Sequence, residues 1–273
     1  MTEESDVARH YSSGNLQSRI HAALAEAGLS EPLDPDALAP LDEFHIGGRE
    51  TTARLVDKLD LGPGKYALDM GCGLGGAARH VARRTGAAVV GVDLTSEFIA
   101  AGLELTGMCG LADRVKHVRA SITNLPFNDG LFDAVYMIHV GMNIADKHRL
   151  AQEAARVLKP GGRFGICDVM RLTEDDIPYP VPWASSRHQS SVMGADRYRF
   201  LLEDVGFDIV SDVSLAGFAL DSLDSLIARV ADPGPLGLHL VMGEDAGEKV
   251  ANMAASIRAG HIAPHVIVGC LPG

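Results

Sequence analysis

Three glycines and an aspartate form the clearest chemical pattern in this 273-residue sequence. Gly71, Gly73 and Gly76 have the spacing G-x-G-x-x-G within "ALDMGCGLGGAARH", between an apolar run and a helix-like run. Glycines in the first turn after a strand let the backbone approach a ligand without a Cβ in the way. Asp93 ends the next apolar run, where a carboxylate can accept hydrogen bonds from both hydroxyls of a ribose. The pattern predicts a site for an adenosine cofactor.

Asp69, two residues before Gly71, distinguishes two such cofactors by charge. NAD would place a doubly negative pyrophosphate against the loop, whereas S-adenosylmethionine would place an ammonium and a sulfonium there. Opposite charges about 4 Å apart gain on the order of 1–4 kcal/mol in partly wet surroundings. The carboxylate therefore favours S-adenosylmethionine, although it could alternatively cap the following turn. An NAD-dependent oxidoreductase and a non-catalytic S-adenosylmethionine-binding module stay open as alternatives of other classes.

The glycine loop lies in a chain that alternates β-rich and helical runs, which predicts an α/β fold with a mostly parallel sheet covered on both faces. We expect strands in "KYALDMG", "AAVVGVD", "RVKHVRA", "FDAVYMIH" and "RFGICDVM". We expect helices in "GGAARHVARR", "SEFIAAGLELTG" and "KHRLAQEAARVL". Further along, the pattern predicts a helix near residues 196–205, strands in "FDIVSDV" and "PHVIVGC", and two helices at about 220–230 and 245–259.

These elements predict an N-terminal helical extension over residues 1–60 and one α/β domain over residues 61–273. A helix at about residues 15–27 and the Pro-rich "SEPLDPDALAPLDEF" make up most of the extension. Within the domain, a helical insertion at about residues 217–260 is expected to pack over the ligand edge of the sheet as a lid or a subunit contact. Homo-oligomerisation is therefore an open possibility.

Composition excludes several classes of function. The formal net charge is −12, and no window gathers enough Lys and Arg for a phosphate-binding stripe, so we expect no nucleic-acid partner. No apolar run reaches the roughly 18 residues of a membrane span, and the N-terminus is acidic and polar, so we expect a cytoplasmic protein with no membrane partner. The four cysteines form no C-x-x-C pair, which indicates reduced thiols and no metal site.

Four segments together resemble the class I S-adenosylmethionine-dependent methyltransferases. They are "LDMGCGLGG", "VVGVDLT", "RASITNLPFNDGLFDAV" and "RVLKPGGRFGICDV", which occur in the family's order over about residues 65–170. The resemblance implies a Rossmann-like sheet of seven strands in the order 3-2-1-4-5-7-6 with the last strand antiparallel. It also implies S-adenosylmethionine as cofactor and S-adenosylhomocysteine as product.

A narrower resemblance concerns the acceptor. The segments "HYSSGNLQSRI", "LDEFHIGGRETT", "IHVGMNIADK" and "YPVPWA" resemble bacterial relatives of the sarcosine/dimethylglycine N-methyltransferases. The resemblance implies a small-molecule acceptor, with the amine of sarcosine or dimethylglycine as the first hypothesis. An O- or C-methyltransferase acting on a lipid, quinone or secondary metabolite would keep the same cofactor motifs and is the alternative.

The family pattern also implies the residues that hold the cofactor. The methionine end is expected at Asp69, Gly71 and Gly73, with Cys72 as a small residue of the same loop, and the ribose at Asp93. Leu94, Ser121 and Ile122 are expected to meet the adenine, although the family often has Asp where this chain has Ser121. Tyr11 and Gly48 are expected to cover the methionine end from the N-terminal segment. His139, which follows the fourth strand, completes the set.

Methyl transfer from a sulfonium needs alignment of the acceptor, exclusion of water and, for many acceptors, a base. His139 is the candidate base, because its unperturbed pKa near 6.5 suits proton acceptance, but it could instead pack against the cofactor. Asp168 could orient His139, bind an ammonium substrate or cap a turn. The residues expected to bind the acceptor are Met142, Asn143, Tyr179 and Trp183, with Arg187 as the partner of a carboxylate.

Overall fold

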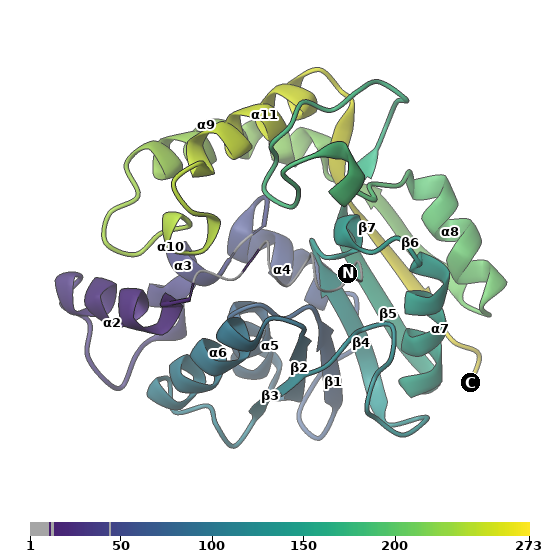
Figure 1. Cartoon of the computed structure of the whole chain (residues 1–273). Helices are drawn as coiled ribbons and strands as arrows, with labels where there is room; N and C mark the ends of the chain where they lie inside the picture. The colour runs from purple at the N-terminus through teal and green to yellow at the C-terminus, as the bar shows by residue number, and fades with distance from the viewer. Residues whose placement is uncertain (1–10, 12–13, 44) are drawn as a thin grey trace.

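A single seven-stranded sheet forms the centre of the computed structural model, which describes residue 11 and residues 14–43 and 45–273. The first ten residues of the predicted N-terminal extension therefore lie outside the described part. The strand order is β3-β2-β1-β4-β5-β7-β6, and β7 is antiparallel to both of its neighbours (Figure 1). The strands are β1 (Tyr66–Met70), β2 (Ala88–Asp93), β3 (Val115–Arg119), β4 (Phe132–Ile138), β5 (Leu158–Arg171), β6 (Asp208–Ser214) and β7 (Ile262–Cys270).

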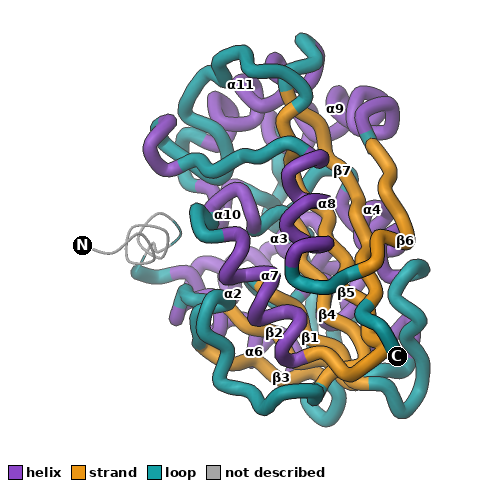
Figure 2. Tube along the Cα trace, turned by 90° about the vertical axis from the view of Figure 1, so that its right-hand side faces the viewer, coloured by secondary structure: helices purple, strands orange, loops and turns teal. Residues whose placement is uncertain are grey.

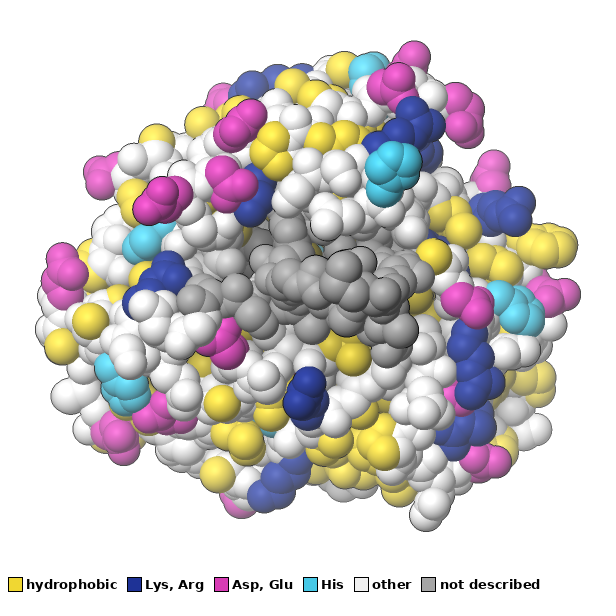
Figure 3. Space-filling model, in the orientation of Figure 1, with side chains coloured by type: hydrophobic (Ala, Val, Ile, Leu, Met, Phe, Trp, Pro, Cys, Tyr) yellow, Lys and Arg dark blue, Asp and Glu magenta, His cyan; other side chains and the backbone are white. Residues whose placement is uncertain are grey.

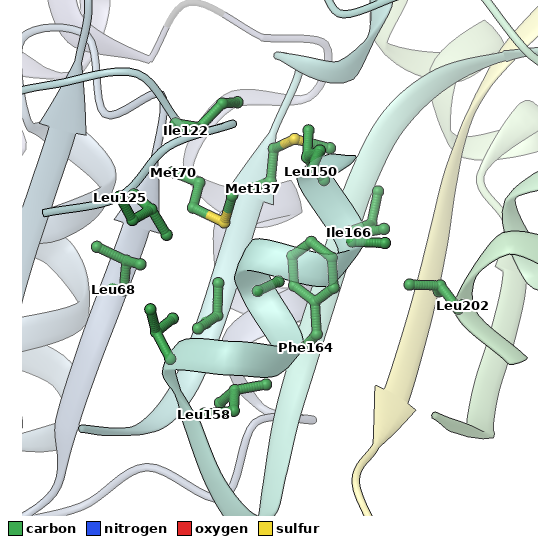
Figure 4. Close-up of a cluster of buried hydrophobic side chains, with 14 of the residues drawn as sticks. Leu68, Met70, Ile122, Leu125, Met137, Leu150, Leu158, Phe164, Ile166 and Leu202 are labelled. Carbon is green, nitrogen blue, oxygen red and sulfur yellow. The ribbon is translucent and has the colours of Figure 1, made fainter. Parts of the chain in front are cut away.

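Successive side chains of the central strands point to opposite faces of the sheet, and both faces are buried. On one face, Leu68 and Met70 of β1 pack with Phe164 of β5 and Leu150 (Figure 4). Helices α7 (Lys147–Val157) and α8 (Ala195–Asp204) cover this face, and both lie in front of the strands in Figure 2.

The other face of the sheet carries Ala67 of β1 and Ala134 of β4, which pack against helices α4 and α5. These helices are α4 (Gly48–Val56) and α5 (Gly76–Thr85), and α6 (Ser96–Met108) packs beside them against β2 and β3. Small residues on the strands allow this close approach of helices. The two layers together hold the strand ends, and so the loops that follow them, in fixed positions.

The N-terminal segment contains α2 (Leu16–Glu26), η1 (Pro35–Leu38) and α3 (Ala39–Asp42). Asp42 forms an ion pair with Arg79 of α5, and both side chains are fully buried. Removing one partner of such a pair would leave an uncompensated buried charge, so the pair fixes this segment against the sheet layer. The segment therefore lies beside the glycine loop as a built part of the fold.

Three further helices lie beyond the C-terminal edge of the parallel strands, and we call them the cap helices. They are α9 (Ala216–Ala231), α10 (His239–Met242) and α11 (Ala246–Arg258). Figure 1 shows α9 and α11 side by side above the sheet, with α10 next to α2. On the face shown in Figure 3, acidic and basic side chains are interspersed around the molecule.

The expected fold class and strand order are confirmed, including the antiparallel last strand. Each predicted strand and helix forms within a few residues of its expected place, whereas α3, α4 and α10 were not predicted. None of the described helices is long and apolar enough to cross a membrane. The domain boundaries at residues 60 and 61 stay a prediction, as do the cytoplasmic location and the question of oligomers.

Candidate active site

The glycine loop adopts backbone conformations that favour glycine. Gly71 has φ +83° and Gly73 has φ +52°, both in the left-handed region. A Cβ at Gly71 would collide with the side chain of Val140. The amides of Gly71 and Cys72 both donate to the carbonyl oxygen of Val92, 2.8 and 2.9 Å away, which ties the loop to the end of β2.

Asp93 joins this loop to the start of α6. One oxygen of its carboxylate accepts a hydrogen bond from the amide of Gly73 (3.0 Å), and the other accepts from the amide of Thr95 (2.8 Å). Burial raises the pKa of Asp93, and these backbone donors oppose the rise. Each carboxylate oxygen has a second lone-pair site for a further donor. Asp93 thus lines the cavity with acceptor sites left for ligand donors, and its contact with the ribose hydroxyls stays a prediction.

Asp69 is the residue best suited to a ligand cation. Its side chain is buried, and its Oδ2 has no hydrogen-bond partner within the described residues. Burial raises the pKa of Asp69 to about 8; the hydroxyl of the neighbouring Tyr136 opposes the rise, and the charges of Asp93 and Glu43 add to it. A buried carboxylate without a cation is costly, and a ligand ammonium would supply one. The carboxylate of Asp69 therefore fits the ammonium at the methionine end of S-adenosylmethionine and disfavours a pyrophosphate.

One cavity, which we call the cofactor cleft, brings most of the predicted cofactor residues together at the C-terminal ends of β1, β2 and β4. Gly48 and Ser121 are not among its lining residues; Gly48 begins α4, and the Ser121 Oγ accepts from the amide of Thr123. The predicted cofactor residues that do line it are Tyr11, Asp69, Gly71, Cys72, Gly73, Asp93, Leu94, Ile122 and His139. Asn143, which was predicted to bind the acceptor, lines this cleft instead.

His139, the predicted base, follows β4 and is held by its backbone. Its φ of +54° is unusual for a residue with a side chain, and its amide donates to the carbonyl of Cys167 (2.8 Å). Burial, with a smaller contribution from His45, lowers the pKa of His139 well below its usual value. The imidazole is therefore neutral at neutral pH, and a proton on it would be poorly stabilised.

A second cavity, the acceptor pocket, adjoins the cofactor cleft, and the two share Tyr11, His45 and His139. The cap helices form one wall of the acceptor pocket, and the loop around Trp183 forms another. None of its described lining residues is Asp, Glu, Lys or Arg. Besides the three shared residues, it is lined by Ile46, Met142, Pro182, Trp183, Leu226, Leu238, Met242, Val250 and Met253.

Three predicted site residues lie away from both cavities. Asp168 is fully buried and accepts a hydrogen bond from the Tyr198 hydroxyl (2.5 Å), and it lines neither cavity. Arg187 is exposed and forms an ion pair with Asp176 (2.6 Å), which leaves it at the surface. Tyr179 packs against the apolar cluster of the cap helices without lining the acceptor pocket.

His45 is a polar residue of the site that the sequence analysis did not single out. It contributes to both cavities, and its ring centroid lies 5.7 Å from that of His139. Its Nε2 lies 3.1 Å from Oε2 of the buried Glu43. The only signal was its place in "EFHIGG", and nothing in that segment pointed to a partner 94 positions away.

This fold and cleft define a class of protein: the strand order, the glycine loop after β1 and the acidic residues ending β1 and β2 are those of a Rossmann-like methyltransferase. Residues 68–166 match the family model described as a methyltransferase domain. The chain belongs to the class I S-adenosylmethionine-dependent methyltransferases.

Curated relatives differ in their acceptors. The chain is 35% identical over 186 residues to methyltransferase GfsG of Streptomyces halstedii, and the match covers 66% of each chain. It is 33% identical over 185 residues to the sarcosine/dimethylglycine N-methyltransferase of Halorhodospira halochloris, covering 62% of this chain and 66% of the relative. These matches thus span just under two thirds of each relative.

A solved structure matches nearly the whole chain. The geranyl diphosphate C-methyltransferase of Streptomyces coelicolor A3(2) has a TM-score of 0.71 at 21% identity, with 99% of this chain and 98% of that chain covered. At this identity the likeness shows the fold alone.

Within the described ranges, no three His, Cys, Asp or Glu side chains are grouped as a metal site would require.

Proposed function

We propose that this protein transfers the methyl group of S-adenosylmethionine to a small molecule whose buried part is apolar and uncharged. The single observation that carries the acceptor class is the lining of the acceptor pocket, which offers nine apolar side chains and no Asp, Glu, Lys or Arg among its described residues. Ligand pockets match their ligands in polarity, and a buried charge without a partner is strongly unfavourable. This supports the O- or C-methyltransferase alternative over the amine of sarcosine or dimethylglycine.

The position of Arg187 adds to this argument. A sarcosine or dimethylglycine carboxylate in the acceptor pocket would need a cationic partner, and Arg187 was the predicted one. It lies at the surface in its ion pair with Asp176. Phosphate-bearing acceptors would meet the same lack of a cation within the described lining of the pocket.

The cofactor cleft orients the cofactor, and the acceptor pocket aligns and desolvates the acceptor. S-adenosylmethionine supplies an activated methyl carbon when it is bound. Asp93 and Asp69 orient the ribose and ammonium groups at the strand ends. The apolar wall of the acceptor pocket excludes water and holds the acceptor against the junction of the cavities, so alignment and desolvation are the protein's main contributions.

The test is methyl transfer to a defined panel. The protein is incubated with S-adenosylmethionine labelled in its methyl group, and products are followed by mass spectrometry. The panel holds sarcosine, dimethylglycine, phosphoethanolamine, geranyl diphosphate, a sterol, a naphthol and an uncharged macrolide. We expect label in one or more of the uncharged apolar compounds and none in the two glycine derivatives.

Calorimetric binding of S-adenosylmethionine and of NAD is measured on the same preparation. Binding of S-adenosylmethionine together with transfer only to sarcosine or dimethylglycine would overturn the acceptor class. Binding of NAD without binding of S-adenosylmethionine would overturn the proposed activity as a whole.

A further inference from the structure

The junction of the two cavities is where a methyl group must pass, because the cofactor cleft and the acceptor pocket meet there. Three described residues line both cavities: Tyr11, His45 and His139. Any side chain that takes a proton from the acceptor during transfer has to be one of these or be reached through one of them. The structure distinguishes them by their partners.

His139 and Tyr11 are poor proton acceptors in this setting. His139 is buried, its pKa is lowered well below the usual value, and no carboxylate pairs with its ring among the described residues. Burial, and then the charge of Asp93, raise the pKa of Tyr11, and its hydroxyl donates to Oδ1 of Asn143 (3.2 Å). Tyr11 therefore stays protonated and acts as a donor.

His45 has the environment that the other two lack. Its Nε2 is 3.0 Å from the carbonyl oxygen of Gly48, 3.0 Å from Oγ1 of Thr52 and 3.1 Å from Oε2 of Glu43. A carbonyl and a carboxylate can only accept, so these contacts place the hydrogen on Nε2. The lone pair is then on Nδ1, which makes no hydrogen bond within the described part of the chain.

Glu43 is held ionised behind His45. Burial opposes its ionisation, but the hydrogen bond and charge of His45, with Arg49 and Thr52, outweigh burial and lower the pKa of this carboxyl to about 2. Arg49 Nη1 lies 3.1 Å from Oε1 of Glu43, and Thr52 donates to Oε2 (3.1 Å). A positive charge that forms on His45 thus has a fixed negative partner.

We propose that His45, supported by Glu43, accepts the proton that the acceptor loses on methylation; this inference rests on the proposed function. The bond between the acceptor atom and the methyl carbon forms as the methyl–sulfur bond breaks, and the electron pair of that bond stays on sulfur. The acceptor's proton passes to Nδ1 of His45, and Glu43 stabilises the resulting imidazolium through Nε2. His45 is the catalytic residue here, and Glu43 is a positioning residue.

The first test needs no acceptor. In the protein with bound S-adenosylhomocysteine, long-range ¹H–¹⁵N correlation spectra of labelled histidine report which ring nitrogen carries hydrogen, and His45→Gln assigns the signal. We expect hydrogen on Nε2 and a free Nδ1 at the alkaline end of a pH titration. Hydrogen on Nδ1 would overturn the proposal. Failure of S-adenosylhomocysteine and S-adenosylmethionine to bind wild-type protein would instead overturn the proposed function.

The second test uses the panel compound that receives the most label. We expect His45→Gln to lower kcat at least 100-fold, the usual range for a general base, while the Kd of S-adenosylmethionine changes less than 3-fold. Glu43→Gln should lower kcat about 10-fold and move the ascending limb of the pH profile to lower pH, because the imidazolium loses its partner. The other groups that face His45, namely Arg49, His139 and Tyr11, stay unchanged in both variants.

A matched control is available on the surface. His148 pairs with Asp204 across 3.0 Å, and both side chains are exposed. His148→Gln removes a histidine–carboxylate pair without touching either cavity, so its kcat and pH profile should equal those of the wild type. A folded His45→Gln variant, with an unchanged melting temperature and wild-type kcat, would overturn the proposal. An unmoved pH limb in Glu43→Gln would remove the role of Glu43.

Discussion

The cofactor cleft and the acceptor pocket meet at three residues, yet they are built in opposite ways. The cleft is made of strand ends and tight turns, with the carboxylates of Asp69 and Asp93 aimed into it. The acceptor pocket is made mainly of helix faces and a loop, and apolar side chains line most of it. A shared cofactor needs fixed polar contacts, whereas an acceptor of this kind needs shape and dryness. The strand ends must therefore keep the polar contacts to the cofactor, whereas the cap helices can change the shape of the acceptor pocket without disturbing those contacts.

The strongest way to break this comparison is to neutralise Asp69. Asp69→Asn keeps the shape but removes the charge that faces the ligand ammonium. A hydrogen bond to a charged group contributes about 1.5–3 kcal/mol, so we expect the Kd of S-adenosylmethionine to rise roughly 10- to 150-fold. Calorimetry measures it, with Asp57→Asn as the control, since Asp57 is exposed and pairs with Arg84 on the surface. An unchanged Kd would show that the ammonium is held elsewhere.

Cofactor binding should also depend on pH in a direction set by Asp69. Its pKa is raised to about 8 in the free protein, so the carboxyl is mostly protonated at pH 6. Binding of an ammonium favours the ionised form and releases a proton. Affinity for S-adenosylmethionine should therefore rise about tenfold per unit, or about 1.4 kcal/mol, between pH 6 and pH 7. It should fall again above about pH 8, where the ligand's own amino group loses its proton.

The measurement is calorimetry in two buffers of different ionisation enthalpy, which counts the protons released on binding. About one proton per cofactor is expected at pH 6. Asp69→Asn should abolish both the release and the rise in affinity. If the variant keeps the wild-type pH dependence, another group at the cleft is responsible.

These two regions also differ in how far the sequence predicted them. Gly71, Asp69 and Asp93 act through local geometry, since each lies at the end of a strand whose place follows from its apolar run. Short-range patterns therefore identified most of the predicted residues that line the cofactor cleft. Ser121 and Gly48 were expected in its lining and instead hold the turn and helix beside it.

The acceptor pocket depends on long-range packing that no local pattern reports. Leu226, Met242 and Met253 lie on three different cap helices, and each reads as an ordinary core residue until the helices meet. His45 is brought to His139 by the fold of the N-terminal segment. Arg187 looked suited to a carboxylate by its charge alone, because sequence gives residue type but not the direction of a side chain in a long loop.

A polar group introduced into the acceptor pocket would sharpen the comparison. Val250→Thr changes a methyl into a hydroxyl of similar size on a buried side chain of α11 that lines this pocket. Burying an unsatisfied hydroxyl costs about 1 kcal/mol or more, so we expect the KM of the labelled panel compound to rise about fivefold. The Kd of S-adenosylmethionine should not change.

The control for that variant is the same chemical change at the surface. Val210 on the edge strand β6 is 55% exposed, so Val210→Thr should leave KM, Kd and the melting temperature as they are. A KM equally unaffected in Val250→Thr would mean that the acceptor does not contact α11. A parallel rise in the Kd of S-adenosylmethionine would mean that the two cavities are not independent.

Arg187 gives the smallest expected effect and a test of the acceptor class. Its guanidinium is exposed and pairs with Asp176, which is also exposed, and such surface pairs contribute little to stability. Arg187→Ala should therefore change kcat, KM and the Kd of S-adenosylmethionine less than twofold when measured with an uncharged apolar acceptor. With sarcosine or dimethylglycine as the acceptor, a KM raised tenfold or more by the same substitution would place the acceptor's carboxylate at this loop, and the amine of an N-methylated glycine would then be the preferred acceptor.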